Sequence, residues 1–519
     1  MTRNALYQRR NLFSMAIPIV LCAFTHLWNP IGFPALHGDE GHYMLKALST
    51  LEGTGLQPQD RYAAPYFGQL FLAGIFKIIG YPDSMSPVEG DVHSIERIWL
   101  VPRVLIGLLA VVDTLLIYKI AERRYNRNVA FVASVLFAVM PLSWVVRRLF
   151  LESIQTPFLL MSILLAVYIC CPLVNKGSKN SSSIDGGNGN NKKGKKKNTL
   201  LILLSGVFLG LAIFTKIPVF AMIPLVGFLI YTNSNRNLKN LGLWFIPVIL
   251  IPLIWPAHAM LAGELDMWFE GVLWQTTGRG DKPLYDALIS FYKTDPVLLT
   301  LSVAGLVFTA IIKKDYIPIM GTIPFLILLY LLGYVSPFHF IPLMPLLCIA
   351  AAVLIADVPN KISNNKKISI QKMLPVIVVS GIGAFGLITT SLSLSKNLTS
   401  AELATSAFIS QQLPNRDSQD GICQYVICNS DVILIGNPIY LWLPKYIFDK
   451  DYEQRTFYAS KQIETEKFIL IEDNGFSRQM SGDDRKAHML KEMYGKSTLM
   501  ASFYDDKEKS KGRIDIRSN

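Results

Sequence analysis

Two adjacent carboxylates and two imidazoles occur in the stretch His37-Gly38-Asp39-Glu40-Gly41-His42-Tyr43, soon after the first long apolar run. This is about where a membrane helix would leave the bilayer, so lipid on one side and protein on the other could exclude water from these groups. A carboxylate in such surroundings can act as a general base toward a hydroxyl group. Because Gly38 and Gly41 also suit a turn, a solvated loop is the alternative interpretation.

The composition indicates what kind of chain must position these groups. Of the 519 residues, 51% are hydrophobic and only 17% are charged, and the mean hydropathy is +0.35, whereas a soluble domain carries about 25% charged residues. These values predict a polytopic α-helical membrane protein. The basic N-terminus precedes an apolar run longer than a signal-peptide core, which predicts a retained first membrane helix. Apolar runs predict about eleven transmembrane helices, at roughly 12–30, 99–120, 129–146, 153–174, 200–215, 217–232, 241–258, 296–312, 317–335, 340–357 and 373–395.

Lysine and arginine residues in the short loops predict the orientation in the membrane. With the N-terminus in the cytoplasm, the basic clusters around 3–10, 122–127, 175–199, 236–239, 313–314 and 361–372 all fall inside. The acidic stretch at 37–43 and the tail then fall outside. The segment 175–199 is rich in glycine, serine, asparagine and lysine, which predicts a disordered cytoplasmic linker.

The pattern divides the chain into two domains. Residues 1–395 form the transmembrane domain, and its outer loop 31–97 is expected to hold two helices that rest on the membrane surface. Residues 396–519 contain two short apolar runs typical of buried strands, at 432–435 and 467–471, and helical patterns near 399–412 and 484–494. We therefore expect a small extracytoplasmic α/β domain, in which Cys423 and Cys428 could pair and the sequon at Asn397 could be modified.

Four basic side chains are exceptions to the positive-inside rule, because they lie near the outer ends of predicted helices. Arg147 and Arg148 stand between the third and fourth helices, Lys216 stands between the fifth and sixth, and Arg103 opens the second. Such residues suggest a retained anionic partner, either Glu152 or a phosphate group. Basic side chains that extend from helix ends to the membrane surface are the alternative.

Further candidates lie in the later outer loops. Trp274 and Gln275 belong to the loop 259–295, where mixed aromatic and polar residues suit either sugar binding or an aromatic belt at the interface. His339 stands at another outer helix end and could also be a simple turn residue. The sequence contains no glycine-rich phosphate loop, zinc-protease pair or serine-hydrolase elbow, so no ATP-binding module is expected.

Five short motifs resemble the GT-C glycosyltransferase superfamily, especially the branch of the protein O-mannosyltransferases and the lipid A aminoarabinose transferase. The similarity covers roughly residues 10–360. Two positions depart from the pattern of that branch, because Ala64-Pro65-Tyr66 replaces a proline pair and His339-Phe340 replaces an Arg-Tyr pair. The motifs are Asp39–Tyr43, Arg103–Gly107, Arg148–Glu152, Gly210–Lys216 and His339–Pro345.

The resemblance implies a membrane enzyme that moves a mannose-like sugar, with inversion, from a polyprenyl-phosphate carrier to a protein or lipid hydroxyl on the outer face. It implies no nucleotide or other cofactor and no nucleic-acid partner; a divalent metal at the paired carboxylates is possible but not favoured. Alternatives are a polytopic transporter or lipid flippase, for which internal repeats would be expected, and a non-catalytic surface-assembly protein whose tail is the working part. The implied site consists of the catalytic residues Asp39 and Glu40, the phosphate-binding residues Arg103, Arg147, Arg148 and Lys216, and the substrate-binding residues His42, Tyr43, Glu152, Trp274, Gln275 and His339.

Overall fold

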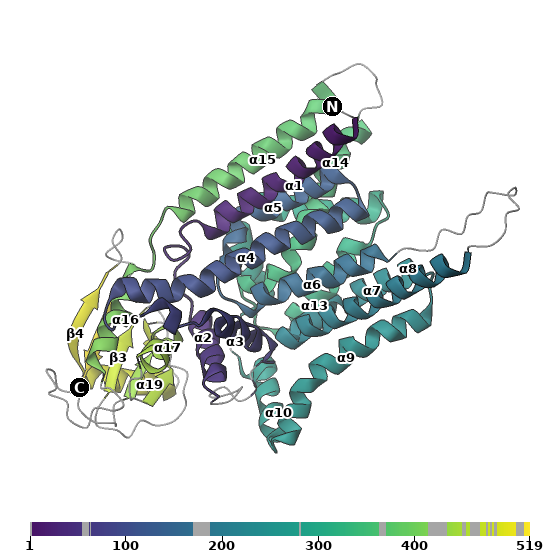
Figure 1. The fold of residues 1–519 in the computed structure, drawn as a ribbon. Coiled ribbons are helices and arrows are strands. Elements are labelled where there is room, and N and C mark those ends of the chain that lie inside the picture. Colours follow the sequence, from purple (N-terminus) through teal and green to yellow (C-terminus); the bar gives the residue numbers. More distant parts are fainter. Residues whose placement is uncertain are drawn as a thin grey trace, which may run out of the picture.

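The structure is a computed structural model, and it places a bundle of long helices beside a small sheet (Figure 1). The N-terminus lies at the end of the bundle that is far from the sheet. The residues that the structure describes are 3–53, 62, 64–169, 187–279, 282–362, 370–413, 433–448, 453–456, 468–473, 476–477, 480–481, 485–504 and 513–519.

Every apolar run that was predicted to span the membrane coincides with a helix or with a helix that is broken by a turn. Five helices are long and apolar enough to cross a membrane, and two bent pairs raise this number to seven among the described residues. Several of the others are apolar helices of 10–17 residues. The helices of this part are α1 (Arg3–Leu27), α4 (Val92–Arg124), α5 (Arg127–Val139), η2 (Pro141–Arg147), α6 (Leu151–Tyr168), α7 (Gly187–Thr215), η3 (Ile217–Met222), α8 (Ile223–Asn233), α9 (Leu238–Leu261), α12 (Pro296–Val307), η5 (Phe308–Ile312), α13 (Ile317–Leu332), η6 (Pro337–Leu343), α14 (Met344–Ile362) and α15 (Ile370–Leu394).

Short helices occupy the connections on the side of the bundle where the sheet lies. The first long loop contains the two helices expected there, α2 and α3, and each ends at a glycine-containing turn. The later loop contains α10 and α11 with a single turn of π-helix between them. The bounds are α2 (Gly38–Leu51), α3 (Phe67–Ile79), η1 (Asp83–Met85), α10 (Leu265–Leu273), η4 (Trp274–Gly278) and α11 (Leu284–Thr294).

The linker predicted to be disordered over 175–199 is partly helical. Its residues up to 186 lie outside the described part of the chain, but α7 begins at Gly187 and continues without a break into the apolar run. The alternation of glycine, asparagine and lysine is a poor helix pattern taken alone, and the helix that follows it extends into this segment.

The tail forms a five-stranded mixed sheet in the order β2-β1-β3-β5-β4. Strands β1, β2 and β3 run parallel to one another, and β5 pairs antiparallel with both β3 and β4. The two predicted strands correspond to β1 and β3, and the two predicted helices correspond to α16 and α19. Cys423 and Cys428 lie outside the described residues. The elements are α16 (Ser400–Gln412), β1 (Ile433–Gly436), α17 (Pro438–Ile447), β2 (Glu453–Thr456), β3 (Phe468–Glu472), α19 (Arg485–Lys496), β4 (Thr498–Phe503) and β5 (Ile514–Ser518).

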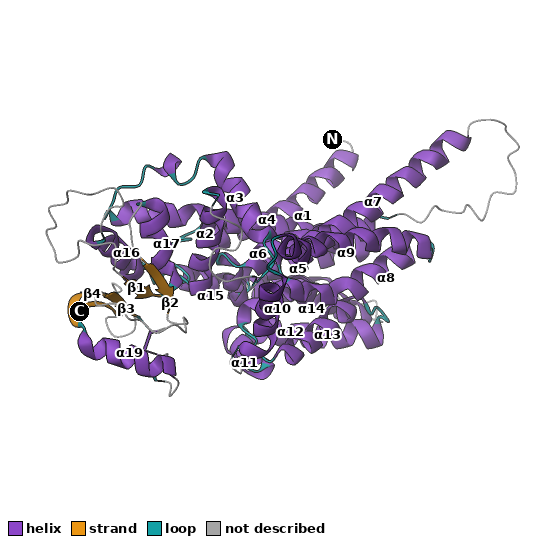
Figure 2. Ribbon diagram, turned by 90° about the horizontal axis from the view of Figure 1, so that it is seen from below, coloured by secondary structure: helices purple, strands orange, loops and turns teal. Residues whose placement is uncertain are grey.

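The hydrophobic core continues from the helical bundle into the tail. Leu434, Ile439 and Trp442 of the tail belong to the same buried cluster as Trp99 of α4. In both views α17 lies beside α2 (Figures 1 and 2). The hydrophobic core is therefore continuous across residue 396, and α17 of the tail packs against α2, the helix that carries Asp39.

Candidate active site

The first turn of α2 carries the predicted base. His37 is the N-cap of this helix: its Nδ1 accepts a hydrogen bond from the Asp39 N–H at 3.2 Å, and Glu40 Oε2 accepts one from the His37 N–H at 2.9 Å. This reciprocal capping box fixes the start of the helix. The Asp39 side chain keeps 41% of its surface exposed. The backbone of Asp39 is therefore held by the cap, while its side chain is accessible.

Glu40, the neighbouring acid, is fully buried and has a structural role. Both of its oxygens accept hydrogen bonds from Arg103, at 3.1 and 2.8 Å, and Oε1 also accepts one from the Leu149 N–H at 3.1 Å. Burial alone would raise the pKa of Glu40, but the charge and hydrogen bonds of Arg103 hold that pKa below its usual value. The structure thus places Glu40, which was predicted to be a catalytic residue, as the buried partner of Arg103.

Arg103 and Arg147 were expected to bind the donor phosphate, and the structure places both of them against backbone carbonyl groups. Arg103 is fully buried and donates to Glu40 and to the carbonyl oxygens of Pro30, Ile31, Pro34 and Ala35. Arg147 is 2% exposed and donates to the carbonyl oxygens of residues 25, 28 and 29. These two guanidinium groups hold the loop between α1 and α2 and have no face left for a phosphate.

Arg148 is placed differently from its neighbour. The Arg148 side chain is half-buried. Its Nε and one terminal nitrogen donate to the Ala35 carbonyl oxygen at 3.2 and 2.9 Å. Its guanidinium group lies 5.0 Å from the centre of the Trp144 ring. Burial lowers the pKa of Arg148 to about 10, while Glu40 and Asp39 act to raise it. The side chain therefore stays cationic at neutral pH and is available beside Asp39.

A second group of charges surrounds Glu152, which is 2% exposed at the start of α6. Lys216, at the end of α7, donates a hydrogen bond to Glu152 Oε1, and His339 Nε2 lies 3.9 Å from the same oxygen. The other oxygen, Oε2, is buried and has no hydrogen-bond partner in the part of the chain that the structure describes. A buried carboxylate oxygen normally has a donor, so this oxygen is suited to a hydroxyl group supplied by a substrate.

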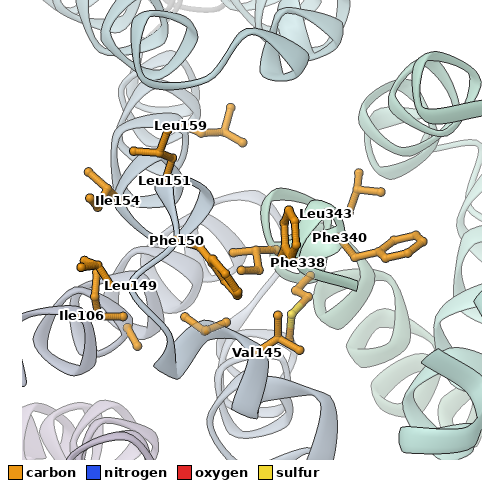
Figure 3. Packing of buried hydrophobic residues seen from close by; sticks show 14 of the residues in the cluster. Ile106, Val145, Leu149, Phe150, Leu151, Ile154, Leu159, Phe338, Phe340 and Leu343 are labelled. Carbon is orange, nitrogen blue, oxygen red and sulfur yellow. The ribbon is translucent and has the colours of Figure 1, made fainter. Parts of the chain in front are cut away.

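Two buried aromatic rings, those of Phe150 and Phe338, pack against charged and polar side chains of this site. The Phe150 and Phe338 rings lie 4.6 Å apart, centre to centre, and Figure 3 shows Phe150 between Phe338 and the Leu149 region of the core. The Lys216 ammonium lies 5.1 Å from the centre of the Phe338 ring, and the His37 ring lies 5.2 Å from that of Phe150. These contacts bring the Asp39 and Glu152 groups to one place, which is consistent with the electrostatic interactions that connect Asp39 to Glu152 and to Arg148.

Two further cations, Lys282 and Arg279, lie near His339 in this site, and no sequence pattern predicts their position there. Lys282 donates to the Ser336 hydroxyl at 2.8 Å and interacts electrostatically with both His37 and His339. Arg279 also acts on His339 and packs against the Trp274 ring at 5.5 Å and the Tyr334 ring at 5.0 Å. Their presence in the outer loop was visible in the sequence, but nothing local predicts that this loop folds back to His339.

The remaining predicted residues lie around this centre. Tyr43 is buried and its ring is 6.0 Å from that of His42, which is half-buried in the same helix. Trp274 is 52% exposed and Gln275 is half-buried, both in η4. Asp113 is fully buried deep in α4, and neither of its side-chain oxygens has a hydrogen-bond partner among the described residues.

Both the fold and part of the sequence resemble known proteins. The model of the Alg9-like mannosyltransferase family, a glycosyltransferase family, matches residues 65–264. The structure of ArnT from Cupriavidus metallidurans bound to undecaprenyl phosphate has a TM-score of 0.59 to this chain at 12% identity, over 98% of this chain and 97% of that one. The chain therefore has the fold of the GT-C glycosyltransferases, and residues 65–264 match a family of mannosyltransferases.

A second solved structure shares the fold of this chain. It is the oligosaccharyltransferase of Archaeoglobus fulgidus, tethered to an acceptor peptide, with a TM-score of 0.55 at 11% identity over 97% of this chain and 73% of that one. No curated protein sequence matches the chain. The resemblance seen in the sequence motifs is therefore confirmed at the level of the superfamily, and the multi-pass membrane character is confirmed with it.

Proposed function

We propose that this glycosyltransferase moves a mannose-like sugar from a polyprenyl-phosphate carrier to a hydroxyl group of a protein or lipid, with Asp39 as the general base. The similarity to ArnT with bound undecaprenyl phosphate and to an oligosaccharyltransferase with a bound acceptor peptide supports a lipid-phosphate donor and such acceptors. The observation that carries the proposal is an accessible carboxylate, Asp39, that interacts electrostatically with Arg148 and with Glu152, the partner of Lys216.

The proposed reaction is a single displacement. The acceptor oxygen attacks the anomeric carbon of the sugar while its proton passes to the Asp39 carboxylate. The bond from the anomeric carbon to the phosphate oxygen breaks, and its electron pair leaves with the lipid phosphate. Attack from the opposite side inverts the configuration of that carbon.

The leaving phosphate gains negative charge, so cations beside it lower the barrier. We assign this task to Lys216, Arg148, Lys282 and Arg279, in place of the buried Arg103 and Arg147. The free Oε2 of Glu152 is assigned to a sugar hydroxyl, and the exposed Trp274 and Gln275 to contacts with the substrates at the rim. The proposal requires no cofactor, because the chain's own side chains serve as base and as electrostatic stabilisers.

The remaining parts of the proposal concern the membrane. We propose that the chain spans it about eleven times, with the N-terminus in the cytoplasm and the tail 396–519 as an extracytoplasmic α/β domain. The sugar would then be transferred on the outer face, at the depth of the lipid headgroups. The distribution of basic loops supports this orientation.

The test is a transfer assay with purified protein in detergent. Polyprenyl-phosphate mannose, radiolabelled in the sugar, is incubated with a membrane extract as the acceptor source. The products are separated, and label transferred from the donor to protein or to another lipid is counted. Asp39→Asn is expected to reduce turnover by about 10²–10⁴-fold, while Asp266→Asn, a change at an exposed acid of α10, leaves it unchanged. Normal turnover by Asp39→Asn would refute the assignment of the base.

A further inference from the structure

The loop between α1 and α2, which leads to Asp39, also forms hydrogen bonds with the start of the tail. Asn29 donates to the Lys396 carbonyl oxygen at 2.9 Å, and the Leu398 N–H donates to the Gly32 carbonyl oxygen at 2.8 Å. The buried Thr399 hydroxyl donates to the Ile31 carbonyl oxygen at 3.1 Å. While Arg103 and Arg147 hold this loop from the helical bundle, the start of the tail holds it from the opposite side.

One peptide group in the loop is held by two oppositely charged side chains. Arg148 donates to the carbonyl oxygen of Ala35, and the N–H of the same peptide group, that of Leu36, donates to Glu402 Oε2 at 3.0 Å. Charged groups make stronger hydrogen bonds than neutral ones, so this pair fixes the plane of the peptide. The next residue along the chain is His37, the cap of the helix that carries Asp39.

Glu402 also acts on the chemistry of the site through charge. Its carboxylate interacts electrostatically with Arg148, which is a proposed phosphate ligand. The same side chain therefore accepts a hydrogen bond from the backbone and carries a charge that stabilises the cationic form of Arg148. It belongs to α16, which packs against α4 in the core.

We infer that Glu402 of the tail is a positioning residue for Asp39 and Arg148 in the transfer reaction. This inference depends on the proposed function. By holding the Ala35–Leu36 peptide against Arg148, Glu402 fixes the start of α2 and so the direction of the Asp39 carboxylate. The tail is then a working part of the active site, since it supplies one of the charges that hold the base in place.

The test measures kcat and KM for polyprenyl-phosphate mannose with Glu402→Gln, Glu402→Ala and a matched control, Glu492→Gln, which changes an exposed acid of α19. Glutamine keeps an oxygen for the Leu36 N–H but removes the charge. We expect kcat to fall by about 10-fold in Glu402→Gln and up to about 100-fold in Glu402→Ala, since misplacing a reacting group by about 1 Å has effects of this size. KM should change much less than kcat, and Glu492→Gln should match the unaltered enzyme.

The outcomes separate this inference from the proposed function. If Asp39→Asn is inactive but both Glu402 variants turn over normally, only the positioning role is overturned. If Asp39→Asn keeps its turnover, the proposed function fails first. Unfolding of Glu402→Gln, which retains the hydrogen bond, or a loss confined to KM would also overturn the inference, because either result would assign Glu402 a role other than alignment.

Discussion

Arg103 donates hydrogen bonds to both carboxylate oxygens of Glu40, and neither side chain has any exposed surface. This pair gives two adjacent acids opposite roles. Glu40 points into the protein and binds the loop from α1 to α2, while Asp39 is turned toward the open side of the helix. The capping hydrogen bond from His37 to Glu40 adds to this arrangement, so the buried acid determines where the accessible one lies.

We predict that breaking this pair affects stability before catalysis. Glu40→Gln leaves Arg103 buried without its counter-charge, which costs about 3–5 kcal/mol in free energy of unfolding. Thermal unfolding of the purified protein in detergent would show this as a marked fall in the midpoint temperature. Arg124→Ala removes a partly exposed pair with Asp315 at 3.1 Å and should cost no more than about 1 kcal/mol. Equal midpoints for Glu40→Gln and the unaltered protein would contradict the structural role.

The sequence predicted the parts of this protein that follow from local pattern. Apolar runs gave the positions of the long helices, and the acids after the first run marked the segment that carries Asp39. The roles of Arg103 and Arg147 were not predictable, because their partners are backbone carbonyl groups of a loop that no side-chain pattern describes. Lys282 and Glu402 were not assigned to the site for a related reason, since their partners are about 54 and 366 residues away in the chain.

We predict that Lys216 contributes mainly to donor binding. Replacing Lys216 by methionine removes a charge-assisted bond of about 1.5–3 kcal/mol, so the affinity for polyprenyl phosphate should fall about 10- to 100-fold. Because the change leaves Glu152 buried without its counter-ion, the double variant Lys216→Met/Glu152→Gln is the informative one. It should fold normally and still bind the lipid phosphate weakly in a titration. Lys239→Met, at an exposed lysine of α9, is the control, and unchanged affinity in the double variant would remove Lys216 from the phosphate site.

The proposed orientation predicts a difference between two introduced cysteines. In a variant whose natural cysteines are replaced, Asn190→Cys lies in the basic linker and Asp266→Cys lies in the outer loop. An impermeant thiol reagent applied to intact cells should label only the second, and permeabilised cells should show both labelled. Labelling of Asn190→Cys in intact cells would invert the topology and place Asp39 on the cytoplasmic side.

His37 predicts a pH dependence of stability. Burial lowers the pKa of His37 below its usual 6.5, Asp39 opposes this shift and Arg148 adds to it. The unfolded chain therefore binds the proton more readily than the folded one, so this residue's contribution to stability is complete above about pH 6.5 and is lost as pH falls below it. Protonation would also remove the acceptor for the Asp39 N–H, so transfer activity should fall in the same range.

The measurement for His37 is the midpoint of thermal unfolding between pH 7.5 and 5. His37→Asn keeps a helix cap and should show a flatter dependence than the unaltered protein. His93→Gln replaces a histidine whose side chain is 85% exposed and should leave the dependence as it was. Parallel curves for His37→Asn and the unaltered protein would show that His37 does not titrate in this window.

The contact of the tail with α2 predicts a position where even one methyl group is not tolerated. A Cβ on Gly41 would lie 2.5 Å from the backbone of Pro438 and Ile439 at the start of α17, and backbone atoms cannot move away as a flexible side chain can. Gly41→Ala should therefore push α17 away from α2. The change should lower the free energy of unfolding by an amount typical of overpacking, about 1–3 kcal/mol, and reduce kcat.

Gly74→Ala is the matched control for this contact. Gly74 lies inside α3, and a Cβ there would meet nothing within 4 Å, so alanine should be neutral or add up to about 1 kcal/mol through its better helix propensity. Because both changes place alanine in a short helix of the same outer loop, a difference between them reports the contact with α17. If Gly41→Ala and Gly74→Ala behave alike in unfolding and in transfer, the tail does not press on the helix that carries Asp39. If only Gly41→Ala loses activity while folding is retained, the tail acts on the base through this contact as well as through Glu402.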